Sequence, residues 1–460
     1  MTNQHTPPKD LLEAMQYLDW NEALPVDDAR WVDTEDARGS HRAFATLLRN
    51  VGYDINRKHL RDLKQQHVLL YGHVGSGKST ELNRLAQRLA PDNPFLIIHL
   101  DVANELDRNN LQYADVLMAL AHKLVEEIER RDMSISPDAL KPLEDWFYEQ
   151  VLTKERQISL GMELETGVQI SAGIPMLAKL FSKFKSYLRT NSAYKEALRL
   201  TVRNGFTFFA IAFNALLTHV EMRLRERGVA KRVLFVVDGT DKLTDEDNKR
   251  FFIVEASQLL AIEGLVIYTA PLHMRFQGSV VQTLEHVTWP MIKAVDKNGN
   301  RVDLGHQALS DILLHRVDSS VFAPGALDRL VEMSGGHPRE LLRLFRKCCE
   351  LADENRVTEA IVQRAIELQA SEYLRWLTAE HYTILAAEDI RDQGAPYQKG
   401  MDQLIINVAL LEYNEGSWRR SHPVVRTLIS YQEAVVRRDV ALTAEKRALE
   451  AATAPPTQAI

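Results

Sequence analysis

Short apolar runs alternate with helical patterns over the first 290 residues of the chain. The runs that predict strands cover residues 68–71, 95–100, 232–237, 264–269 and 285–289. Apolar residues at three- and four-residue spacing predict helices at residues 41–50, 81–89, 111–131 and 206–220. We expect the last of these helices to be buried. Because strands separated by helices form parallel sheets, the pattern predicts an α/β fold with a doubly wound parallel sheet.

The pattern becomes helical after residue 300, with helices expected at residues 306–317, 324–333, 338–351 and 358–368. These predict a helical lid at residues 301–370. Residues 371–440 combine short helices with a turn between strands near residues 410–418, which suits a small winged-helix domain. We expect a polar N-terminal tail at residues 1–30, with one short amphipathic piece at residues 11–18, and a flexible tail at residues 441–460.

Residues 151–205 interrupt the core predicted for residues 31–300. Two period-two runs around a glycine-bearing turn predict a β-hairpin at residues 158–174. Pro175 then opens an amphipathic helix with Lys179, Lys183 and Lys185 off its apolar face. The segment has nine Lys and Arg against four Glu, a net charge of +5. Contact with a partner, a membrane surface or nucleic acid, and an ordinary solvated face, are alternatives for this helix.

Glycines gather directly after the first strand. Residues 72–79 fit G-x-x-x-x-G-K-[ST], the phosphate-binding loop, and have the flanking strand and helix that a chance glycine-rich turn would lack. The glycines let backbone N–H groups approach phosphate, Lys78 is expected to reach the β- and γ-phosphates, and Ser79 to hold Mg²⁺. The candidate nucleotide-binding residues are Gly72, His73, Val74, Gly75, Ser76, Gly77, Lys78, Ser79 and Thr80. Residues 31–39 either pack on the base or form an ordinary linker.

Two carboxylates follow the apolar run at residues 232–237. Asp238 ends this strand, where a second Mg²⁺ ligand is expected in an open α/β sheet. Asp241 either orients the attacking water or caps a helix that begins near Asp245. Thr269 ends the next strand, so its hydroxyl is a candidate sensor of the γ-phosphate.

A glycine-proline turn joins two of the later helices. Gly335 and Gly336 end the first helix, and Pro338 opens the second at a favoured position. Arg339 then lies in the first turn, where a cation opposes the helix dipole. A facing phosphate would explain this cation, and Pro338 joins the candidate nucleotide-binding residues. The alternative is that these residues only end one helix and begin the next, with Arg339 paired to a surface carboxylate.

Composition narrows the class of protein. The 460 residues suffice for two to four domains, and 56 Lys and Arg against 63 Asp and Glu give a net charge of −7, which excludes a global polycation for nucleic acid. The adjacent Cys348 and Cys349 fit neither a disulfide framework nor a metal site, so a cytoplasmic location is expected. The N-terminus shows no signal-peptide pattern, and the most apolar stretch contains Asn214 and His219, so we expect no membrane span.

With these residues placed, the chain resembles the signal-transducing P-loop ATPases with numerous domains (the STAND class) and the origin-recognition branch of the AAA+ ATPases. Residues 72–79 match their first motif, and residues 233–243 resemble the NACHT-like run of aliphatics followed by Asp-Gly-x-Asp. Residues 334–339 resemble the lid motif, with Arg339 where origin-recognition ATPases place a sensor arginine. The resemblance covers residues 31–430 and implies a P-loop NTPase core, ATP and Mg²⁺, a helical lid, a winged helix and nucleotide-governed assembly.

Two departures from the family pattern predict slow hydrolysis. Gly239 stands where typical AAA+ ATPases have a glutamate, and Lys242 where NACHT proteins often have an acid. The leading hypothesis is an ATP-dependent switch or assembly platform. It would act as a homo-oligomer or with a separate effector protein in bacterial stress or phage defence. The alternatives are a DNA-binding ATPase, which would use the winged helix with its local cluster of Arg419, Arg420 and Arg426 and the basic insertion, and a small-molecule kinase.

Overall fold

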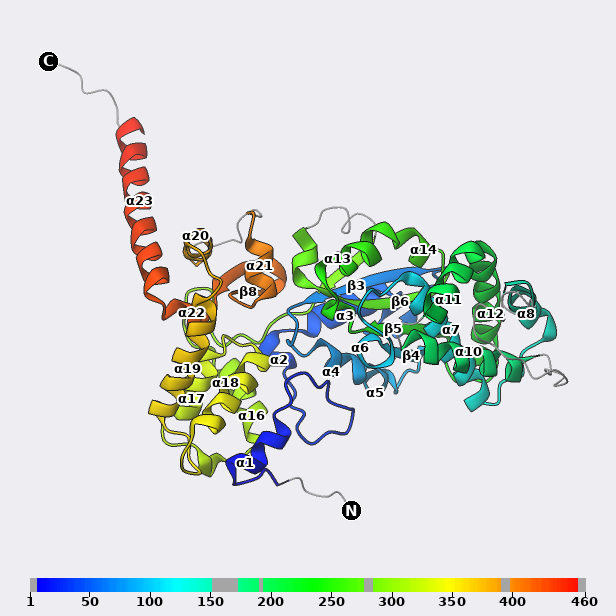
Figure 1. Ribbon diagram of the computed structural model, residues 1–460, viewed down its shortest axis with the longest axis horizontal. Helices are drawn as coiled ribbons and strands as arrows, with labels where there is room; N and C mark the ends of the chain where they lie inside the picture. The colour runs from blue at the N-terminus through cyan, green and yellow to red at the C-terminus, as the bar shows by residue number, and fades with distance from the viewer. Residues whose placement is uncertain (1–5, 151–172, 190–192, 277–283, 390–397, 454–460) are drawn as a thin grey trace. The chain divides into compact units, whose positions relative to one another are not determined.

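The computed structural model describes residues 6–150, 173–189, 193–276, 284–389 and 398–453 (Figure 1). The chain divides into two compact units. The first, here called the sheet unit, contains Arg42–Tyr71 and Lys78–Thr288. The second, here called the helical unit, contains Met1–His41, Gly72–Gly77 and Trp289–Ile460.

The sheet unit is built on a five-stranded sheet with the order β4-β5-β6-β3-β7. Its strands are β3 (Gln66–Gly72), β4 (Phe95–Asp101), β5 (Arg232–Asp238), β6 (Leu265–Pro271) and β7 (Glu285–Thr288). The pairs β4–β5, β5–β6 and β3–β7 are parallel. Every residue of β5 and β6 is buried, as expected for central strands covered on both faces. The predicted α/β fold with a parallel sheet is therefore confirmed.

Helices and a small hairpin complete the sheet unit. The phosphate-binding loop is followed by two short helices, which meet at Arg84, and not by the single predicted helix. The elements are α3 (His41–Asn50), β1 (Tyr53–Asp54), β2 (His59–Leu60), α4 (Lys78–Asn83), α5 (Leu85–Leu89), α6 (Val102–Glu105), α7 (Tyr113–Arg130), α8 (Pro137–Gln150), α10 (Ile174–Leu188), α11 (Ala193–Asn204), α12 (Phe206–Glu226), α13 (Asp245–Lys249) and α14 (Ala256–Leu260).

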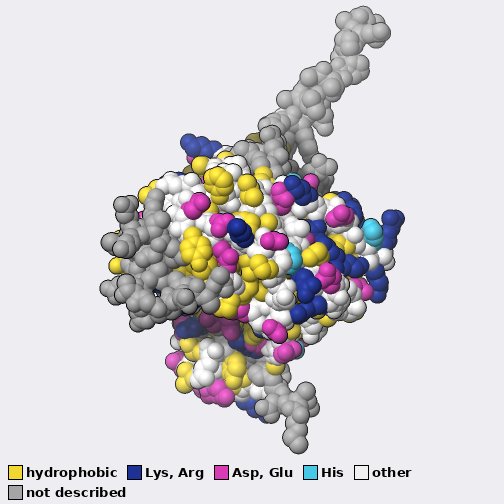
Figure 2. All heavy atoms as spheres, turned by 90° about the vertical axis from the view of Figure 1, so that its right-hand side faces the viewer, with side chains coloured by type: hydrophobic (Ala, Val, Ile, Leu, Met, Phe, Trp, Pro, Cys, Tyr) yellow, Lys and Arg dark blue, Asp and Glu magenta, His cyan; other side chains and the backbone are white. Residues whose placement is uncertain are grey.

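Helix α12 differs from the buried helix that the sequence predicts. One face is buried, but Phe208 is 73% exposed and Ile211 is 60% exposed. Figure 2 shows apolar side chains gathered on the face of the sheet unit that carries α8 and α12. Within the described ranges, no single helix is long and apolar enough to cross a membrane. Only α11 and α12 taken together, with an 82° bend between them, meet that criterion.

The basic insertion is partly described. The predicted hairpin lies mostly within residues 151–172, outside the described residues, whereas the predicted helix is α10, which packs its apolar face on α7. Two of the positive charges counted in this segment are buried in ion pairs. Arg199 Nε donates to Asp115 Oδ1 at 2.9 Å, and Lys195 Nζ lies 3.3 Å from Asp107 Oδ2. These pairs neutralise part of the charge that suggested a basic surface.

The helical unit contains the four helices predicted for the lid and a mixed region after them. The β8–β9 pair is an antiparallel hairpin, and α20 packs on α23. Helix α23 continues to Thr453, where the sequence predicted a flexible tail. The elements are α1 (Leu11–Ala14), α2 (Glu35–Arg38), α16 (Asp303–Leu314), α17 (Ala326–Met333), α18 (Pro338–Leu351), α19 (Glu359–Leu374), α20 (Ala379–Glu388), α21 (Met401–Ile406), β8 (Leu410–Tyr413), β9 (Trp418–Ser421), α22 (Pro423–Arg426) and α23 (Ile429–Thr453). The winged-helix identity of this region stays a prediction.

The N-terminal segment at residues 8–31, here called the strap, is built into the helical unit and is not a tail. Ala14 and Leu18 are completely buried. The N–H of Leu11 donates to Asn355 Oδ1 at 2.7 Å, and Asn355 Nδ2 donates to the Lys9 carbonyl at 2.7 Å. The sequence predicted a polar tail with one short amphipathic piece at residues 11–18, and the fold buries the apolar side of that piece.

Candidate functional site

The phosphate-loop lysine forms a buried ion pair in the sheet unit. Lys78 is the first residue of α4, and its Nζ lies 2.7 Å from Oδ2 of Asp241, with 2% and 3% of the two side chains exposed. Among the described residues, Asp241 Oδ1 has no hydrogen-bond partner. The helix α13 is capped by Thr244, so the capping role considered for Asp241 is excluded.

The turn that places Asp241 depends on glycine. Gly239 has φ +83°, and a Cβ there would lie 3.1 Å from the N atom of Ala103. Thr240 then donates a hydrogen bond to the Thr269 carbonyl, and the two threonine hydroxyl oxygens are 3.3 Å apart. Strand β6 continues to Pro271, so Thr269 does not end it as predicted. Thr269 anchors the Asp241 turn to β6, and its contact with a γ-phosphate stays a prediction.

Asp238 ends β5 and lies beside the phosphate loop's serine. Ser79 Oγ donates to Asp238 Oδ1 at 3.1 Å, and the Gly239 N–H donates to the same oxygen at 2.8 Å. Burial raises the pKa of Asp238, and the nearby charge of Asp241 raises it further. A buried carboxylate in this situation is stabilised by a cation. The hydroxyl and carboxylate oxygens are donors that Mg²⁺ prefers, so the two residues fit the ion predicted for them.

The described residues contain no group of three or more His, Cys, Asp or Glu side chains placed to hold a metal ion. Magnesium sites in nucleotide-binding proteins commonly use one or two protein ligands and complete the coordination with water and phosphate. Ser79 and Asp238 are sufficient for a site of that type.

His99 faces the same carboxylate and was not singled out in the sequence. It lies on β4, with Nε2 3.9 Å from Asp238 Oδ2. Burial lowers the pKa of His99, and the opposing effect of Asp238 is smaller. A neutral imidazole beside Asp238 leaves that carboxylate's charge uncompensated. The available signal was one polar residue within the apolar run at residues 95–100.

The glycine part of the phosphate loop groups with the helical unit, where two arginines lie against it. Gly75 and Gly77 have φ of +91° and +98°. A Cβ at Gly75 would lie 2.5–2.8 Å from the Cβ, Cδ and Nε atoms of Arg339. A Cβ at Gly77 would lie 3.1 Å from Arg38 Nη2. Two guanidinium groups therefore concentrate positive charge along a backbone that already suits anions.

Arg38 belongs to the segment at residues 31–39 that was a candidate base contact. Its side chain is buried, with Nε donating to Thr34 Oγ1 at 2.8 Å and Nη1 to the Pro290 carbonyl at 2.9 Å. No sequence signal marks this arginine, because its approach to Gly77 depends on the tertiary fold.

His73 connects the phosphate loop to the hairpin of the helical unit. The N–H of Glu412 on β8 donates to His73 Nε2 at 2.9 Å. The His73 ring meets the His337 ring edge-on, with ring centres 6.1 Å apart. His337 caps α18 by accepting the N–H of Glu340. The loop, the start of α18 and β8 are thus in mutual contact.

Glycine is required where α17 passes into α18. A Cβ at Gly336 would lie 2.0 Å from the Ile292 carbonyl oxygen, and one at Gly335 would lie 2.5 Å from Leu411 Cδ1. Pro338 is the first residue of α18, as predicted. The structure therefore gathers the predicted residues in two groups. The sheet unit contains Lys78, Ser79, Thr80, Asp238, Asp241 and Thr269, and the helical unit contains Gly72, His73, Val74, Gly75, Ser76, Gly77, Pro338 and Arg339.

The arginine cluster near residue 420 is not an open basic surface. Arg419 is buried and pairs with Glu412 at 2.8 Å and Glu388 at 3.4 Å. Arg426 Nη2 lies 3.1 Å from Asp389 Oδ1. Burial lowers the pKa of Arg420, whose Nη1 donates to the Asp296 carbonyl at 3.3 Å. All three arginines thus have partners within the helical unit, and the cluster does not form a free basic surface.

No family model and no curated protein matches this sequence. Among solved structures, Cdc6p from Pyrobaculum aerophilum is similar with a TM-score of 0.37 and 9% identity, covering 91% of this chain and 98% of that chain. The RuvB Holliday junction branch migration motor of Thermotoga maritima gives 0.34 and 11%, covering 87% and 97%. The Orc1 protein of Aeropyrum pernix, in complex with DNA, gives 0.34 and 14%, covering 92% and 96%. Similarity this distant assigns neither family nor activity.

Proposed function

We propose that this chain is an ATP-binding, Mg²⁺-dependent P-loop ATPase that works as a nucleotide-controlled switch or assembly platform, like the AAA+ and STAND ATPases that it resembles. The observation that carries the proposal is the placement of Ser79 beside Asp238 and of Lys78 beside Asp241 at the carboxyl end of a parallel sheet. Ligands bind at this end of open α/β sheets.

The chain's own residues divide the work. Lys78 exchanges its Asp241 partner for phosphate oxygens, which frees the Asp241 carboxylate to orient a water molecule. Ser79 and Asp238 would hold Mg²⁺, which neutralises phosphate charge when bound. Gly239 has no side chain at the position where typical AAA+ ATPases have a glutamate. Asp241 is therefore the acid available to orient the attacking water, and ATP hydrolysis is slow.

Arg339 supplies the switch. Its side chain lies against Gly75 at the start of the lid helix α18, where a γ-phosphate on the loop would be within its reach. A ligand shifts a two-state lid only through its different affinity for the two states, and a γ-phosphate contact makes ATP and ADP differ in this way. A second copy of the chain or an effector protein would bind preferentially to one of the two states of the lid.

Calorimetry with ATP tests the proposal. Removing the Lys78 ammonium removes a charge-assisted contact of about 1.5–3 kcal/mol, or roughly a 10- to 100-fold loss of affinity. The variant Lys78→Ala/Asp241→Asn removes that contact without leaving a buried unpaired carboxylate, and Lys64→Ala, at an exposed lysine of the same unit, is the control. ATP affinity equal to that of the control would exclude the phosphate-loop assignment.

The alternative of a DNA-binding ATPase is separated by a titration with duplex DNA at several salt concentrations. Phosphate contacts give a steep loss of affinity with salt. The internal pairing of Arg419 and Arg426 leads us to expect no such dependence. Light scattering in ATP and in ADP measures the nucleotide-dependent change of mass that the switch requires.

A further inference from the structure

The strap reaches the arginine that lies on the phosphate loop. Arg339 Nε donates a hydrogen bond to the backbone carbonyl of Trp20 at 3.3 Å. The same side chain packs against Gly75, where no Cβ would fit. Arg339 therefore lies between the phosphate loop on one side and a segment from the other end of the sequence on the other, all within the helical unit.

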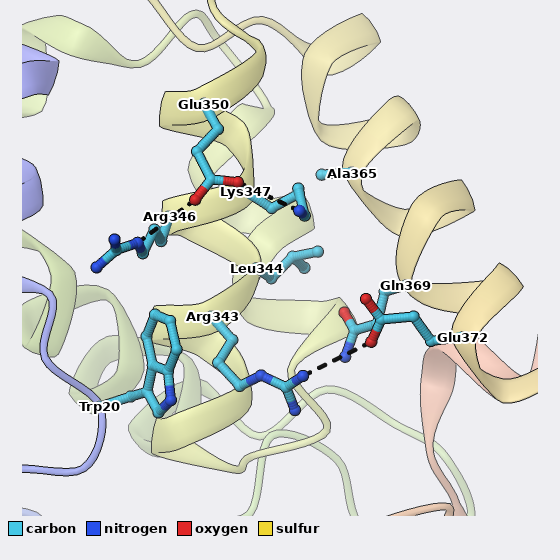
Figure 3. Close-up of a pocket in the computed structure, with 9 residues that line it drawn as sticks. All are labelled: Trp20, Arg343, Leu344, Arg346, Lys347, Glu350, Ala365, Gln369 and Glu372. Atoms are coloured by element: carbon cyan, nitrogen blue, oxygen red, sulfur yellow. Dashed lines mark hydrogen bonds and ion pairs between the residues drawn. The ribbon is translucent and has the colours of Figure 1, made fainter.

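The Trp20 side chain fixes the strap at this point. The indole lies beside α18, with the Arg346 guanidinium 5.2 Å from the ring centre, within cation–π range (Figure 3). Trp20 also lines a pocket of about 140 Å³ with residues of α18 and α19. The Trp20 carbonyl and the Trp20 indole thus contact the same helix, the carbonyl at its first turn and the indole further along it.

The strap is held on the C-terminal side of Trp20 as well. Arg30 forms ion pairs with Asp28 at 2.6 Å and with Glu22 at 2.8 Å. The carbonyl of Arg30 accepts a hydrogen bond from Arg316 Nη1 at 3.1 Å. With Leu18 buried on the N-terminal side, the carbonyl of Trp20 is anchored from both directions. A backbone acceptor held in this way has a defined position relative to α18.

We propose that Trp20 is a positioning residue for Arg339, and that the strap thereby sets how strongly the protein distinguishes ATP from ADP. The inference rests on the proposed role of Arg339. The five N–H donors of a guanidinium lie in one rigid plane, so a bond to Nε fixes the direction of the two terminal nitrogens. Lysine lacks this geometry, and Arg339→Lys would keep the charge but lose the contact with Trp20.

The test compares the ratio of ATP to ADP affinity in Trp20→Ala, Trp20→Phe and Leu12→Ala, by calorimetry. Trp20→Ala removes the indole anchor and is expected to lower the ratio by about two- to tenfold, the range of a net hydrogen bond. Trp20→Phe keeps an aromatic ring against α18 and is expected to restore the ratio. Leu12 is 74% exposed in the same segment, so Leu12→Ala controls for general effects.

A double variant separates positioning from stability. In an Arg339→Ala background, Trp20→Ala is expected to change the ratio no further, because its effect passes through Arg339. If Trp20→Ala lowers ATP and ADP affinity equally, or still acts without Arg339, the positioning role is overturned. If Arg339→Ala lowers the ratio and Trp20→Ala leaves it at the parent value, the strap inference fails while the switch stands. If Arg339→Ala itself leaves the ratio of ATP to ADP affinity unchanged, both the switch role of Arg339 and the positioning role of Trp20 are excluded. The Lys78 variant is a separate test, because it measures only whether the loop binds nucleotide.

Discussion

Lys78 and Asp241 form an ion pair at 2.7 Å within the sheet unit, although 3% or less of either side chain is exposed. Lys78 begins the helix α4 after the phosphate loop, and Asp241 lies in the turn that follows the end of β5. Their pairing balances two buried charges, which would be costly to leave alone. Phosphate binding by Lys78 is therefore linked to release of the carboxylate that we assign to water.

The pair predicts large effects on stability. Removal of one partner leaves an uncompensated buried charge and typically costs about 3–5 kcal/mol. We expect Lys78→Ala and Asp241→Ala each to lower the free energy of unfolding by an amount in this range, measured in urea without nucleotide. The double variant is expected to lose much less than the sum of the two. Strict additivity would show that the ion pair does not exist in solution.

The two acids after β5 predict different kinetic defects. Asp238→Asn is expected to raise the Mg²⁺ concentration needed for ATP binding, because Asp238 and Ser79 form the oxygen pair. Asp241→Asn is expected to keep ATP binding and to slow hydrolysis, because a neutral amide orients the attacking water less well than a carboxylate does. Phosphate release measured with saturating Mg²⁺ separates them. Hydrolysis at the parent rate in Asp241→Asn would remove Asp241 from the mechanism.

Gly75 predicts a steric effect beyond backbone strain. A left-handed conformation costs a non-glycine residue about 1–2 kcal/mol. Gly228→Ala measures that cost alone, since its φ is +63° and a Cβ there would meet nothing within 4 Å. Gly75→Ala adds a collision with Arg339, so we expect a larger loss of stability and weaker ATP binding. Equal losses in the two variants would place Arg339 away from the loop.

His67 predicts a pH dependence of stability. It is buried on β3, with Nε2 2.9 Å from the Ile262 carbonyl oxygen, and burial lowers the pKa of His67 to about 4. The unfolded chain binds the proton near the usual pKa of about 6.5, so stability is fully present above that pH and falls as pH decreases toward 4. Between these pH values, protonation of His67 lowers the free energy of unfolding by about 3 kcal/mol.

Urea unfolding at several pH values measures this dependence. His67→Gln is expected to reduce the fall between pH 6.5 and 4 by the share due to His67. The buried His422, whose pKa burial lowers to about 3, contributes a share of its own that this variant retains. The exposed His59 provides the matched control, and His59→Gln is expected to retain the slope of the parent protein. If His67→Gln and His59→Gln retain equal slopes, His67 does not carry the linkage.

The sheet and the phosphate loop could be predicted because their signals are local. Five short apolar runs mark the strands, and the residues of the loop are consecutive. The Lys78–Asp241 pair could not, because it depends on which strands are neighbours. The strap was predicted only in part. Residues 11–18 form a short amphipathic piece whose Ala14 and Leu18 are buried, but the contact of the strap with α18 depends on the tertiary fold. Phe208 was expected to be buried, as apolarity alone does not say which side of a helix meets the core.

Within the helical unit, His73 makes the phosphate loop dependent on a distant part of the sequence. Its ring nitrogen accepts the N–H of Glu412, so the loop depends on a hairpin more than 300 positions away in the sequence. A recombinant fragment that stops before β8 would keep every residue of the phosphate-binding sequence and yet lose this donor. In such a fragment we expect the loop, more than the sheet, to lose order, because the sheet does not use this bond.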